Sequence, residues 1–228
     1  MTPSAFDFAP WRLSGQVFGV LMNHRPALAA LGDAVNAAPY KAPPKAPVLY
    51  VKPRNTQVAG GARVAVPADV PALEVGAALG LVIGRTAGRL RADEALSAVA
   101  GVVAVADLSV PHASFYRPSV RLKARDGFCP LGVPVPLHAV GDVDALAVAV
   151  SVGGQVVHRT TTGDRLRGAA RLLADVTEFM TLSPGDVLML GVSAGAPQVA
   201  AGQAVDIDIQ GLPRLSFHLV GEGAEVLA

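Results

Sequence analysis

Short apolar runs recur along most of the chain and alternate with turns rich in glycine and proline. Runs of this kind, rich in β-branched residues and either continuously apolar or with polar positions at every second place, are typical of strands. They predict strands at 48–52, 63–66, 73–84, 102–107, 187–192, 204–210 and 214–220. Residues 147–159 contain two alternating runs joined by Gly153 and Gly154, which predicts a hairpin with a two-residue loop.

Three segments have a helical pattern instead. Asn23 is in place to cap a helix over 25–36, and 92–101 predicts a short helix that ends at Gly101. The longest predicted helix covers 164–180, where one face carries Leu166, Ala169, Leu172, Leu173, Val176 and Phe179. Because helices interrupt the strands too irregularly for a doubly wound sheet, the expected fold class is α+β and β-rich, with mixed sheets and a few peripheral helices.

Composition and charge narrow the class of protein. The chain has 228 residues, of which 51% are hydrophobic and 16% charged, so it can bury a substantial core in one large domain or two small similar ones. A net charge of +1 does not favour a general nucleic-acid surface, and no apolar run reaches the roughly 18 residues of a membrane helix. The start lacks the pattern of a secretory signal, and the single cysteine, Cys129, excludes an internal disulfide framework. We therefore expect a cytoplasmic protein without nucleic-acid or membrane partners, in which Cys129 is a buried structural thiol and not a nucleophile.

Residues 114–132 concentrate positive charge, with Arg117, Arg121, Lys123 and Arg125 among aromatic and turn residues. A solvated face and an anion-binding site both account for such a run, and the local pattern leaves the two open. Asp107 ends a predicted buried strand just before this stretch, where strands commonly present site residues. A buried carboxylate needs a metal or a cation as its partner, and Lys123 is a candidate.

A second pair of carboxylates has a simpler explanation. Asp206 and Asp208 lie two apart in a predicted strand and so share one face, as paired metal ligands would. The alternation with Val205, Ile207 and Ile209 makes that face the solvent face of an ordinary strand, which is the preferred interpretation. The five histidines are scattered without the spacing of a zinc site.

The order of several motifs resembles the fumarylacetoacetate hydrolase family. The motifs are, in chain order, YKAPPK, VKPRNT, LGLVIGR, GVVAVADLSV, FYRPSVRLKARDGFCPLG, TTGD, EFMTLSPGD and VAAGQAVDIDIQGLPRL. They cover nearly the whole chain after Gln16, and YKAPPK, KPRNT and RDGFCP make the match specific. Within the family, the chain is most similar to the amino-terminal half, or separate first subunit, of the bifunctional decarboxylase/isomerases of homoprotocatechuate (4-hydroxyphenylacetate) degradation. The resemblance sets the expected boundaries: an extension at 1–15, the family domain at 16–222 and a tail at 223–228.

The resemblance implies the family's mixed, β-rich C-terminal-domain fold and a Mg²⁺ or Mn²⁺ ion that supports enolate chemistry on a 2-oxo or 2-hydroxy-dienoate substrate. By position in the motifs, Asp107 matches the metal-binding aspartate of the family. Lys123 matches the catalytic lysine that holds the developing negative charge, and Asp126 matches the carboxylate that follows it in a substrate-binding role. Tyr116 and Arg117 stand where they are able to pair with a second substrate carboxylate.

The departures from the family pattern concern the metal ligands first. Active members carry ExE eight and six residues before the glycine of the VIG sequence, and those positions here are Gly76 and Ala78. Glu74 lies one pleat along the same face, about 6–7 Å from the required place, and is a candidate replacement. The family's GTP loop reads GVS at 191–193, and the position of its catalytic histidine is Ala27.

Two functions from different classes therefore remain. In the first, the chain is an active enzyme that decarboxylates 5-oxopent-3-ene-1,2,5-tricarboxylate and isomerises 2-hydroxyhepta-2,4-diene-1,7-dioate, with Lys123 and Asp107 in the site. In the second, it is a catalytically degenerate copy that pairs with and stabilises a subunit that retains ExE. Pathway membership favours the first, whereas a single carboxylate, which holds a hard dication poorly, favours the second. The apolar composition predicts association in either case, as a homo-oligomer or with a paralogous subunit.

Overall fold

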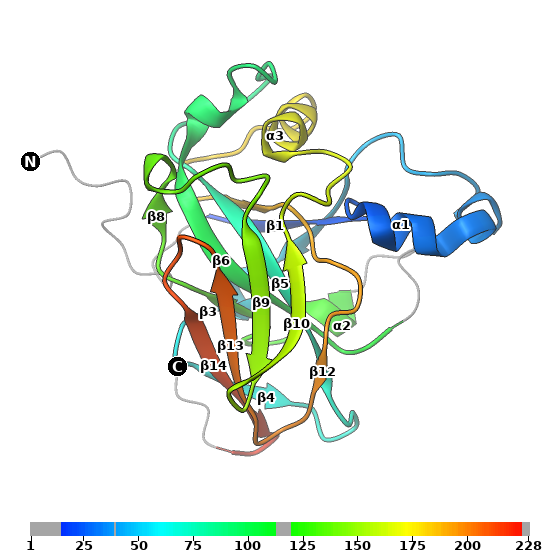
Figure 1. Ribbon diagram of the computed structural model, residues 1–228, viewed down its shortest axis with the longest axis vertical. Coiled ribbons are helices and arrows are strands. Elements are labelled where there is room, and N and C mark those ends of the chain that lie inside the picture. The colour runs from blue at the N-terminus through cyan, green and yellow to red at the C-terminus, as the bar shows by residue number, and fades with distance from the viewer. Residues whose placement is uncertain (1–14, 39, 113–119, 225–228) are drawn as a thin grey trace, which may run out of the picture.

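The computed structural model describes residues 15–38, 40–112 and 120–224, and two β-sheets dominate them (Figure 1). In the described residues, the larger sheet has nine strands in the order β2-β1-β11-β5-β6-β7-β3, with β12 paired to β5 and β8 paired to β6. Its strands are β1 (Val17–Leu21), β2 (Val48–Lys52), β3 (Gln57–Ala59), β5 (Leu73–Ile83), β6 (Val99–Ser109), β7 (Cys129–Leu131), β8 (Val135–Pro136), β11 (Val187–Met189) and β12 (Gln198–Val199). The second sheet has the order β10-β9-β13-β14-β4, with β4 (Arg63–Val66), β9 (Ala147–Val152), β10 (Gln155–Thr161), β13 (Ala204–Ile209) and β14 (Leu215–Gly221). Both sheets mix parallel and antiparallel pairs, as the expected fold class requires.

The long antiparallel strands β5 and β6 form the centre of the larger sheet, and both are buried along nearly their whole length. One face of β5, carrying Leu73, Val75 and Leu79, belongs to the main core against the second sheet. The other face carries Ala78 and Val82 and belongs to a smaller apolar cluster with residues of β1, β6, β7 and β11. The continuous apolar sequence of these strands follows from burial on both faces.

The larger sheet curls around the smaller cluster. Its two edge strands, β2 and β3, are separated in the sequence only by a proline and the 3-10 turn Arg54–Thr56. This short connection keeps the two edges of the sheet close to each other. One face of β1 and β2 therefore lines the same interior as β6 and β7. This curl is what brings side chains of β2 towards the end of β6.

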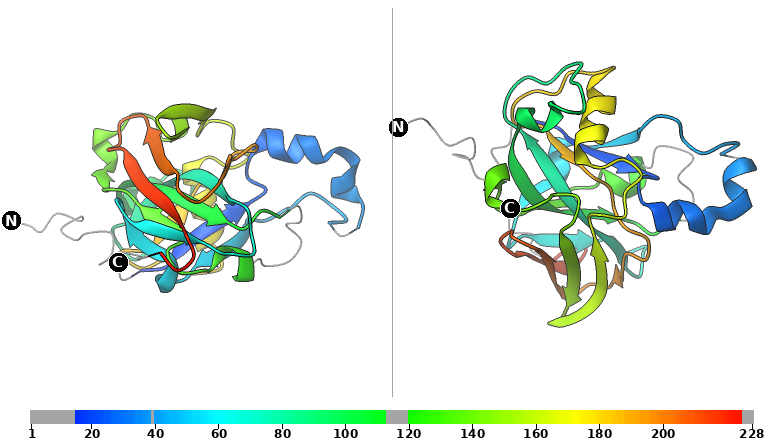
Figure 2. Two further views of the ribbon diagram at one scale, coloured as in Figure 1. Left: turned by 90° about the horizontal axis from the view of Figure 1, so that it is seen from below. Right: turned by 45° about the horizontal axis from the view of Figure 1, so that its top comes forward.

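The helices are short and peripheral. They are α1 (Arg25–Leu31), α2 (Val120–Lys123) and α3 (Ala169–Thr177), with 3-10 helices at Gly32–Asn36, Ala95–Ala98 and Leu137–Ala139. Figure 2 shows α1 and the 3-10 helix after it extending sideways from the sheets, and α1 has no fully buried residue. Within the described residues, no helix is long and apolar enough to cross a membrane.

Most predicted strands are confirmed, as is the hairpin, whose Gly153 and Gly154 take positive φ values of 55° and 82°. Four local predictions are wrong. The cap of α1 is His24 and not Asn23, because the His24 ring accepts the hydrogen bond from the Ala27 amide. The helix predicted at 92–101 is only a 3-10 turn at Ala95–Ala98, since β6 begins at Val99 and pairs there with β5.

The third correction concerns the longest helix. It begins at Ala169, where the carboxylate of Asp144 accepts the backbone amide, and it ends at Thr177. Phe179, predicted on the buried face, lies beyond the helix and is 63% exposed. The strand that was expected to stop at Asp107 also continues for two residues, to Ser109.

Candidate functional site

Asp107, near the end of β6, is the centre of a buried cluster of charged groups. Its side chain is only 2% exposed, and its two carboxylate oxygens have different partners. Oδ2 accepts hydrogen bonds from Tyr50 Oη at 2.5 Å and from Lys123 Nζ at 2.9 Å, whereas Oδ1 lies 2.8 Å from Lys52 Nζ. Burial alone would raise the pKa of Asp107, but the charges of Lys123 and Lys52 and the hydrogen bond from Tyr50 outweigh it and hold the pKa well below its usual range. Asp107 is therefore an ionised carboxylate between two cations.

Lys52 is the most deeply buried member of the cluster, with no exposed surface. Its Nζ donates to three backbone carbonyl oxygens, those of Leu108 at 2.6 Å, Lys123 at 2.9 Å and Phe128 at 2.9 Å. A neutral amine has only two N–H bonds, so three carbonyl acceptors require the ammonium form. Burial lowers the pKa of Lys52, and the charge of Asp107 opposes that effect. Asp107 Oδ1 lies 2.8 Å from the same Nζ, so it receives the charge of Lys52 beside the three carbonyl oxygens.

Tyr50 reaches Asp107 because β1 makes room for its ring. Gly19 pairs with Tyr50 across β1 and β2, and a Cβ added to Gly19 would lie 2.0 Å from the Cζ atom of the ring. The ammonium of Lys123 lies 5.0 Å from the centre of the same ring, within the range of a cation–π contact. Burial and the neighbouring carboxylate raise the pKa of Tyr50 well above its usual value, so the phenol is a neutral hydrogen-bond donor.

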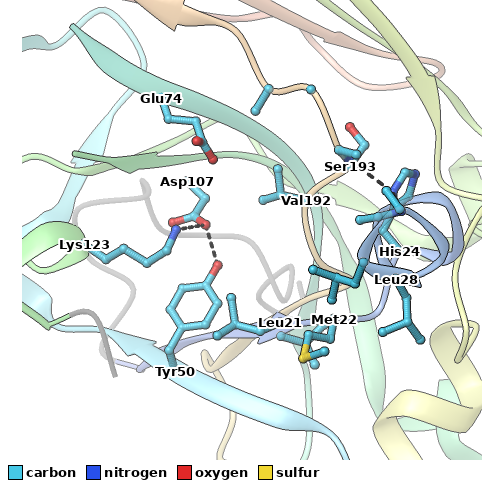
Figure 3. Close-up of a pocket in the computed structure, with 17 residues that line it drawn as sticks. Leu21, Met22, His24, Leu28, Tyr50, Glu74, Asp107, Lys123, Val192 and Ser193 are labelled. Atoms are coloured by element: carbon cyan, nitrogen blue, oxygen red, sulfur yellow. Dashed lines mark hydrogen bonds and ion pairs between the residues drawn. The ribbon is translucent and has the colours of Figure 1, made fainter. Parts of the chain in front are cut away.

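The cluster borders a cavity of about 330 Å³ (Figure 3). Tyr50, Asp107, Lys123 and Glu74 lie at one end of it, and His24 and Ser193 lie at the other. The wall is otherwise largely apolar and comes from the end of β1, from α1 and from the loop after β11: Val20, Leu21, Met22, Ala27, Leu28, Ala30, Leu31, Val192, Ala194, Gly195 and Ala196. The exposed helix α1 thus uses its apolar side to cover the cavity and not to fill the core.

His24 and Ser193 form the second polar end of the cavity, and His158 contacts Ser193 from behind the wall. His24 Nδ1 accepts hydrogen bonds from the backbone amides of Ala27 at 3.3 Å and Ala194 at 3.1 Å. Burial and the nearby charge of Arg165 lower the pKa of His24, which agrees with a neutral ring that carries its proton on Nε2. His158 Nε2 lies 2.9 Å from Ser193 Oγ. This end therefore presents neutral polar groups.

The donor set does not fit the divalent metal ion that the family pattern implies. Gly76 pairs directly with Asp107, but a Cβ on Gly76 would lie 2.7 Å from Val192 Cγ1, so Val192 fills the space in front of the first missing carboxylate. Ala78 faces the closed apolar cluster. Across the described ranges, no group of three or more histidine, cysteine, aspartate or glutamate side chains is arranged to hold a metal. Since both oxygens of Asp107 already face ammonium groups, a dication there would meet two like charges at close range.

Glu74 does not take over the missing positions. It pairs with Ser109, two residues beyond Asp107, although its half-buried side chain lines the same cavity. Burial raises the pKa of Glu74, and the charge of Lys123 opposes that rise. The carboxyl group thus stays one pleat away from Asp107, as the sequence spacing predicts.

The structure brings some of the predicted site residues together and leaves others apart. Asp107 and Lys123 are in direct contact at the cavity. Asp126 is exposed, accepts a hydrogen bond from Asn55 at 2.7 Å, and is not among the residues that line this cavity. Tyr116 and Arg117 lie outside the described residues.

Two further predictions concern residues away from the cavity. Cys129 is completely buried, and burial raises its pKa to about 12, which agrees with a structural thiol. Asp206 accepts a hydrogen bond from Ser216 Oγ at 2.5 Å, and Asp208 pairs with Arg214 at 2.8 Å. The two aspartates therefore have ordinary partners on the polar face of β13.

Sequence reasoning missed Tyr50 and Lys52 as members of the cluster. The signal was present in VLYVK, because Tyr50 and Lys52 alternate with Val51 and so share one face of the strand. Val51 on the opposite face is 43% exposed, so the polar residues, and not the apolar one, point into the protein. A buried ammonium group needs a counter-charge, which Asp107 supplies, and the phenol donates its hydrogen bond to the same carboxylate.

Comparisons with known proteins agree with this architecture. The family model described as fumarylacetoacetate (FAA) hydrolase C-terminal matches residues 16–220. The 4-hydroxyphenylacetate degradation bifunctional isomerase/decarboxylases of Salmonella dublin and Escherichia coli are 40% and 38% identical over 92% of this chain and 48% of their own length. The chain thus spans about half the length of these curated relatives.

Solved structures show the same fold. The 5-carboxymethyl-2-hydroxymuconate delta-isomerase from Mycobacterium smegmatis superposes with a TM-score of 0.78 at 27% identity, over 92% of this chain and 80% of its own. Fumarylpyruvate hydrolase from Pseudomonas aeruginosa, solved in complex with Mn²⁺ and pyruvate, has a TM-score of 0.78 at 23% identity, over 91% of this chain and 90% of its own, a likeness of fold. The resemblance expected from the motifs is confirmed, and the chain belongs to the fumarylacetoacetate hydrolase C-terminal family.

Proposed function

We propose that this chain is one subunit, or one half, of a homoprotocatechuate isomerase/decarboxylase. The enzyme decarboxylates 5-oxopent-3-ene-1,2,5-tricarboxylate, isomerises 2-hydroxyhepta-2,4-diene-1,7-dioate, or does both. The identity of 38–40% to bifunctional enzymes of this name, over 92% of the chain, supports the assignment. Those relatives are about twice as long, which supports a working unit that contains a second, related part, either another copy or a paralogous subunit. We propose the cytoplasm as the location of such an assembly, because the curated relatives are named for the degradation of a small acid, 4-hydroxyphenylacetate.

Within this assembly, the metal-dependent chemistry takes place in the partner and not in this chain. The observation that carries this proposal is the contact between Gly76 and Val192, which closes the space where a ligand carboxylate would stand. The two lysines that contact Asp107 also support the proposal. Their charges already neutralise this carboxylate, which is the one metal ligand of the family pattern that the chain retains. The partner is a subunit with glutamates at the two positions occupied here by Gly76 and Ala78.

A second candidate function is catalysis by this cavity without a metal ion. The observation in its favour is that Lys123 and Tyr50 both line the cavity beside Asp107. An ammonium group and a neutral phenol are able to hold an oxygen on which negative charge develops, as an enolate requires. Both groups are fixed by contacts within the cluster, so such a site would be preorganised.

An assay of the purified chain separates the two. Loss of the conjugated chromophore of the tricarboxylate is followed for the chain alone, with and without Mg²⁺, and after addition of a subunit that carries ExE. Activity only in the mixture supports the role as the non-catalytic part, whereas metal-independent activity of the chain alone supports the second candidate. Lys123→Met would abolish activity in the second case, and Lys45→Met, at an exposed position, is the matched control. Absence of activity in every mixture would contradict the assignment to this enzyme.

A further inference from the structure

Ser193 and His158 form a pair that the proposed function does not use. Ser193 is part of the cavity wall, and its Oγ lies 2.9 Å from His158 Nε2, behind that wall. Burial lowers the pKa of His158, so its ring is neutral near neutral pH. In the tautomer with its proton on Nδ1, Nε2 accepts the hydroxyl proton of Ser193. A hydroxyl on a cavity wall with a neutral imidazole behind it is the arrangement of a serine nucleophile and its general base.

The loop that carries Ser193 has the spacing G-x-S-x-G, at Gly191, Ser193 and Gly195. In that motif the glycines permit a sharp turn that presents the serine hydroxyl to a substrate. Both glycines take positive φ values here, 99° and 76°, and the loop follows strand β11. The short strand β12 follows the loop where the motif usually leads into a helix, so the likeness is one of turn geometry and not of fold.

The same end of the cavity provides hydrogen-bond donors beside the serine. Among the described residues, the backbone amides of Gly195 and Ala196 have no acceptor, and both residues line the cavity. His24 lines it too, with its proton on Nε2, while its Nδ1 holds the loop in place through the Ala194 amide. Donors of this kind are able to hold a carbonyl oxygen on which negative charge develops.

From these observations we propose that Ser193 and His158 hydrolyse carboxylic esters with a short apolar acyl chain. Ser193 Oγ bonds to the carbonyl carbon while its proton passes to His158 Nε2. The bond from that carbon to the alcohol oxygen then breaks, and the alcohol leaves with the proton. A water molecule, with His158 as its base, next attacks the acyl group, releases the carboxylic acid and restores the serine. The acyl chain lies against Leu28 and Leu31, in a largely apolar cavity of about 330 Å³.

The ester site is separate from the buried charged cluster. Ser193 lies at the opposite end of the cavity from Asp107 and Lys123 (Figure 3). The activity therefore goes beyond the proposed function, and it stands or falls independently of whether any mixture turns over the tricarboxylate.

A fluorophosphonate, which modifies serine nucleophiles covalently, tests the pair in the full chain with EDTA present. We expect the intact mass to increase by a single phosphonyl group, and peptide mapping to place that group on Ser193. The labelled chain should no longer hydrolyse 4-nitrophenyl butyrate. Absence of the adduct, or an adduct on Lys123 or on another serine, would overturn the proposal. This measurement does not depend on the folding of any variant.

Two variants separate catalysis from a structural hydrogen bond. His158→Gln keeps an acceptor for Ser193 Oγ but is unable to take its proton, and Ser193→Ala removes the nucleophile. Each should lower kcat/KM for 4-nitrophenyl butyrate by about a hundredfold or more. His138→Gln and Ser183→Ala, at exposed positions, are the matched controls and should leave it unchanged. Hydrolysis that survives in His158→Gln would show that the bond only ties the loop to β10, and the proposal would then be wrong.

Discussion

Val192 lies directly against the α-carbon of Gly76. A Cβ added to Gly76 would stand 2.7 Å from Val192 Cγ1 and 2.8 Å from Cγ2, and 3.1 Å from the carbonyl oxygen of Asp107. Real Cβ atoms do not approach other atoms this closely, so any side chain at position 76 requires the side chain of Val192, or the loop that carries it, to shift. The glycine is thus favoured by packing, at the place where the family pattern led us to expect a carboxylate.

The first prediction follows from this contact. Gly76→Ala should lower the free energy of unfolding by about 1–3 kcal/mol, which is the usual cost of an overpacked core, although alanine suits a strand better than glycine does. In a chain that already carries Val192→Ala, the same substitution should cost clearly less. Urea unfolding of the two single variants and the double variant measures the coupling. Additive effects of the two changes would contradict the contact.

Removing the carboxylate at the centre of the cluster should cost more than removing a surface one. Asp107→Asn leaves two buried ammonium groups without a counter-charge, and we expect a loss of about 3–5 kcal/mol in the free energy of unfolding near neutral pH. Asp93→Asn, at a surface ion pair whose aspartate is 64% exposed, is the matched control and should change it by less than about 1 kcal/mol.

The same substitution should alter the dependence of stability on pH. The pKa of Asp107 is lower in the folded protein than in the unfolded chain, so its stabilising effect is present above the unfolded pKa of about 4 and is lost as the pH falls below that value. The stability difference between the wild type and Asp107→Asn should therefore shrink as the pH is lowered from about 5 towards 2. A difference that is constant across this window would show that the carboxylate is not held in its ionised form.

Asn23 should be a strong stabilising residue even though it is not the cap of α1. Its side-chain amide donates to the carbonyls of Arg167 at 3.0 Å and Leu190 at 2.9 Å, and its oxygen accepts from the Arg167 amide at 2.9 Å. Asn23→Ala leaves these backbone groups without partners, and we expect a loss of about 2–4 kcal/mol. Asn36→Ala, at an exposed position of the 3-10 helix, should be nearly neutral. Thermal unfolding of both variants measures the difference, and equal effects would refute it.

The thiol of Cys129 should be unreactive in the folded protein. It is fully buried, and its pKa of about 12 leaves very little thiolate at pH 8. A thiol-specific reagent such as Ellman's reagent should therefore modify the native chain orders of magnitude more slowly than the chain in denaturant. Because the chain has one cysteine, a fast reaction of the native protein would directly show that Cys129 is exposed.

The strands were predictable from sequence because each carries its own apolar pattern. β5 and β6 were found from continuous apolar runs, and the hairpin from Gly153 and Gly154, since these signals are local. The helix predicted over 92–101 failed for the opposite reason. Its apolar positions from Val99 onwards are taken by pairing with β5, a tertiary interaction that outweighs local helix propensity.

The site was predictable only in part. Asp107 and Lys123 were found from their positions near a strand end and in a cationic stretch, and the structure places them in contact. Tyr50 and Lys52 were not, because the alternation in β2 shows that they share a face but not which strand end that face meets. Val192 fills the space in front of Gly76 from a loop more than a hundred residues further along the chain. No local sequence pattern predicts such a contact.

Lys52 also couples the site to the folding of the whole sheet. Its ammonium group joins carbonyls that are 56, 71 and 76 positions away in the sequence, so each hydrogen bond closes a long loop and bears a large entropic cost. Until all three segments are in place, water solvates this cation better than a partly assembled interior does, and the contacts of Lys52 therefore form late and together. The buried charge of Lys52 is in this sense a product of cooperativity: no fragment that lacks β2, β6, α2 or Phe128 is able to hold that charge in its buried position.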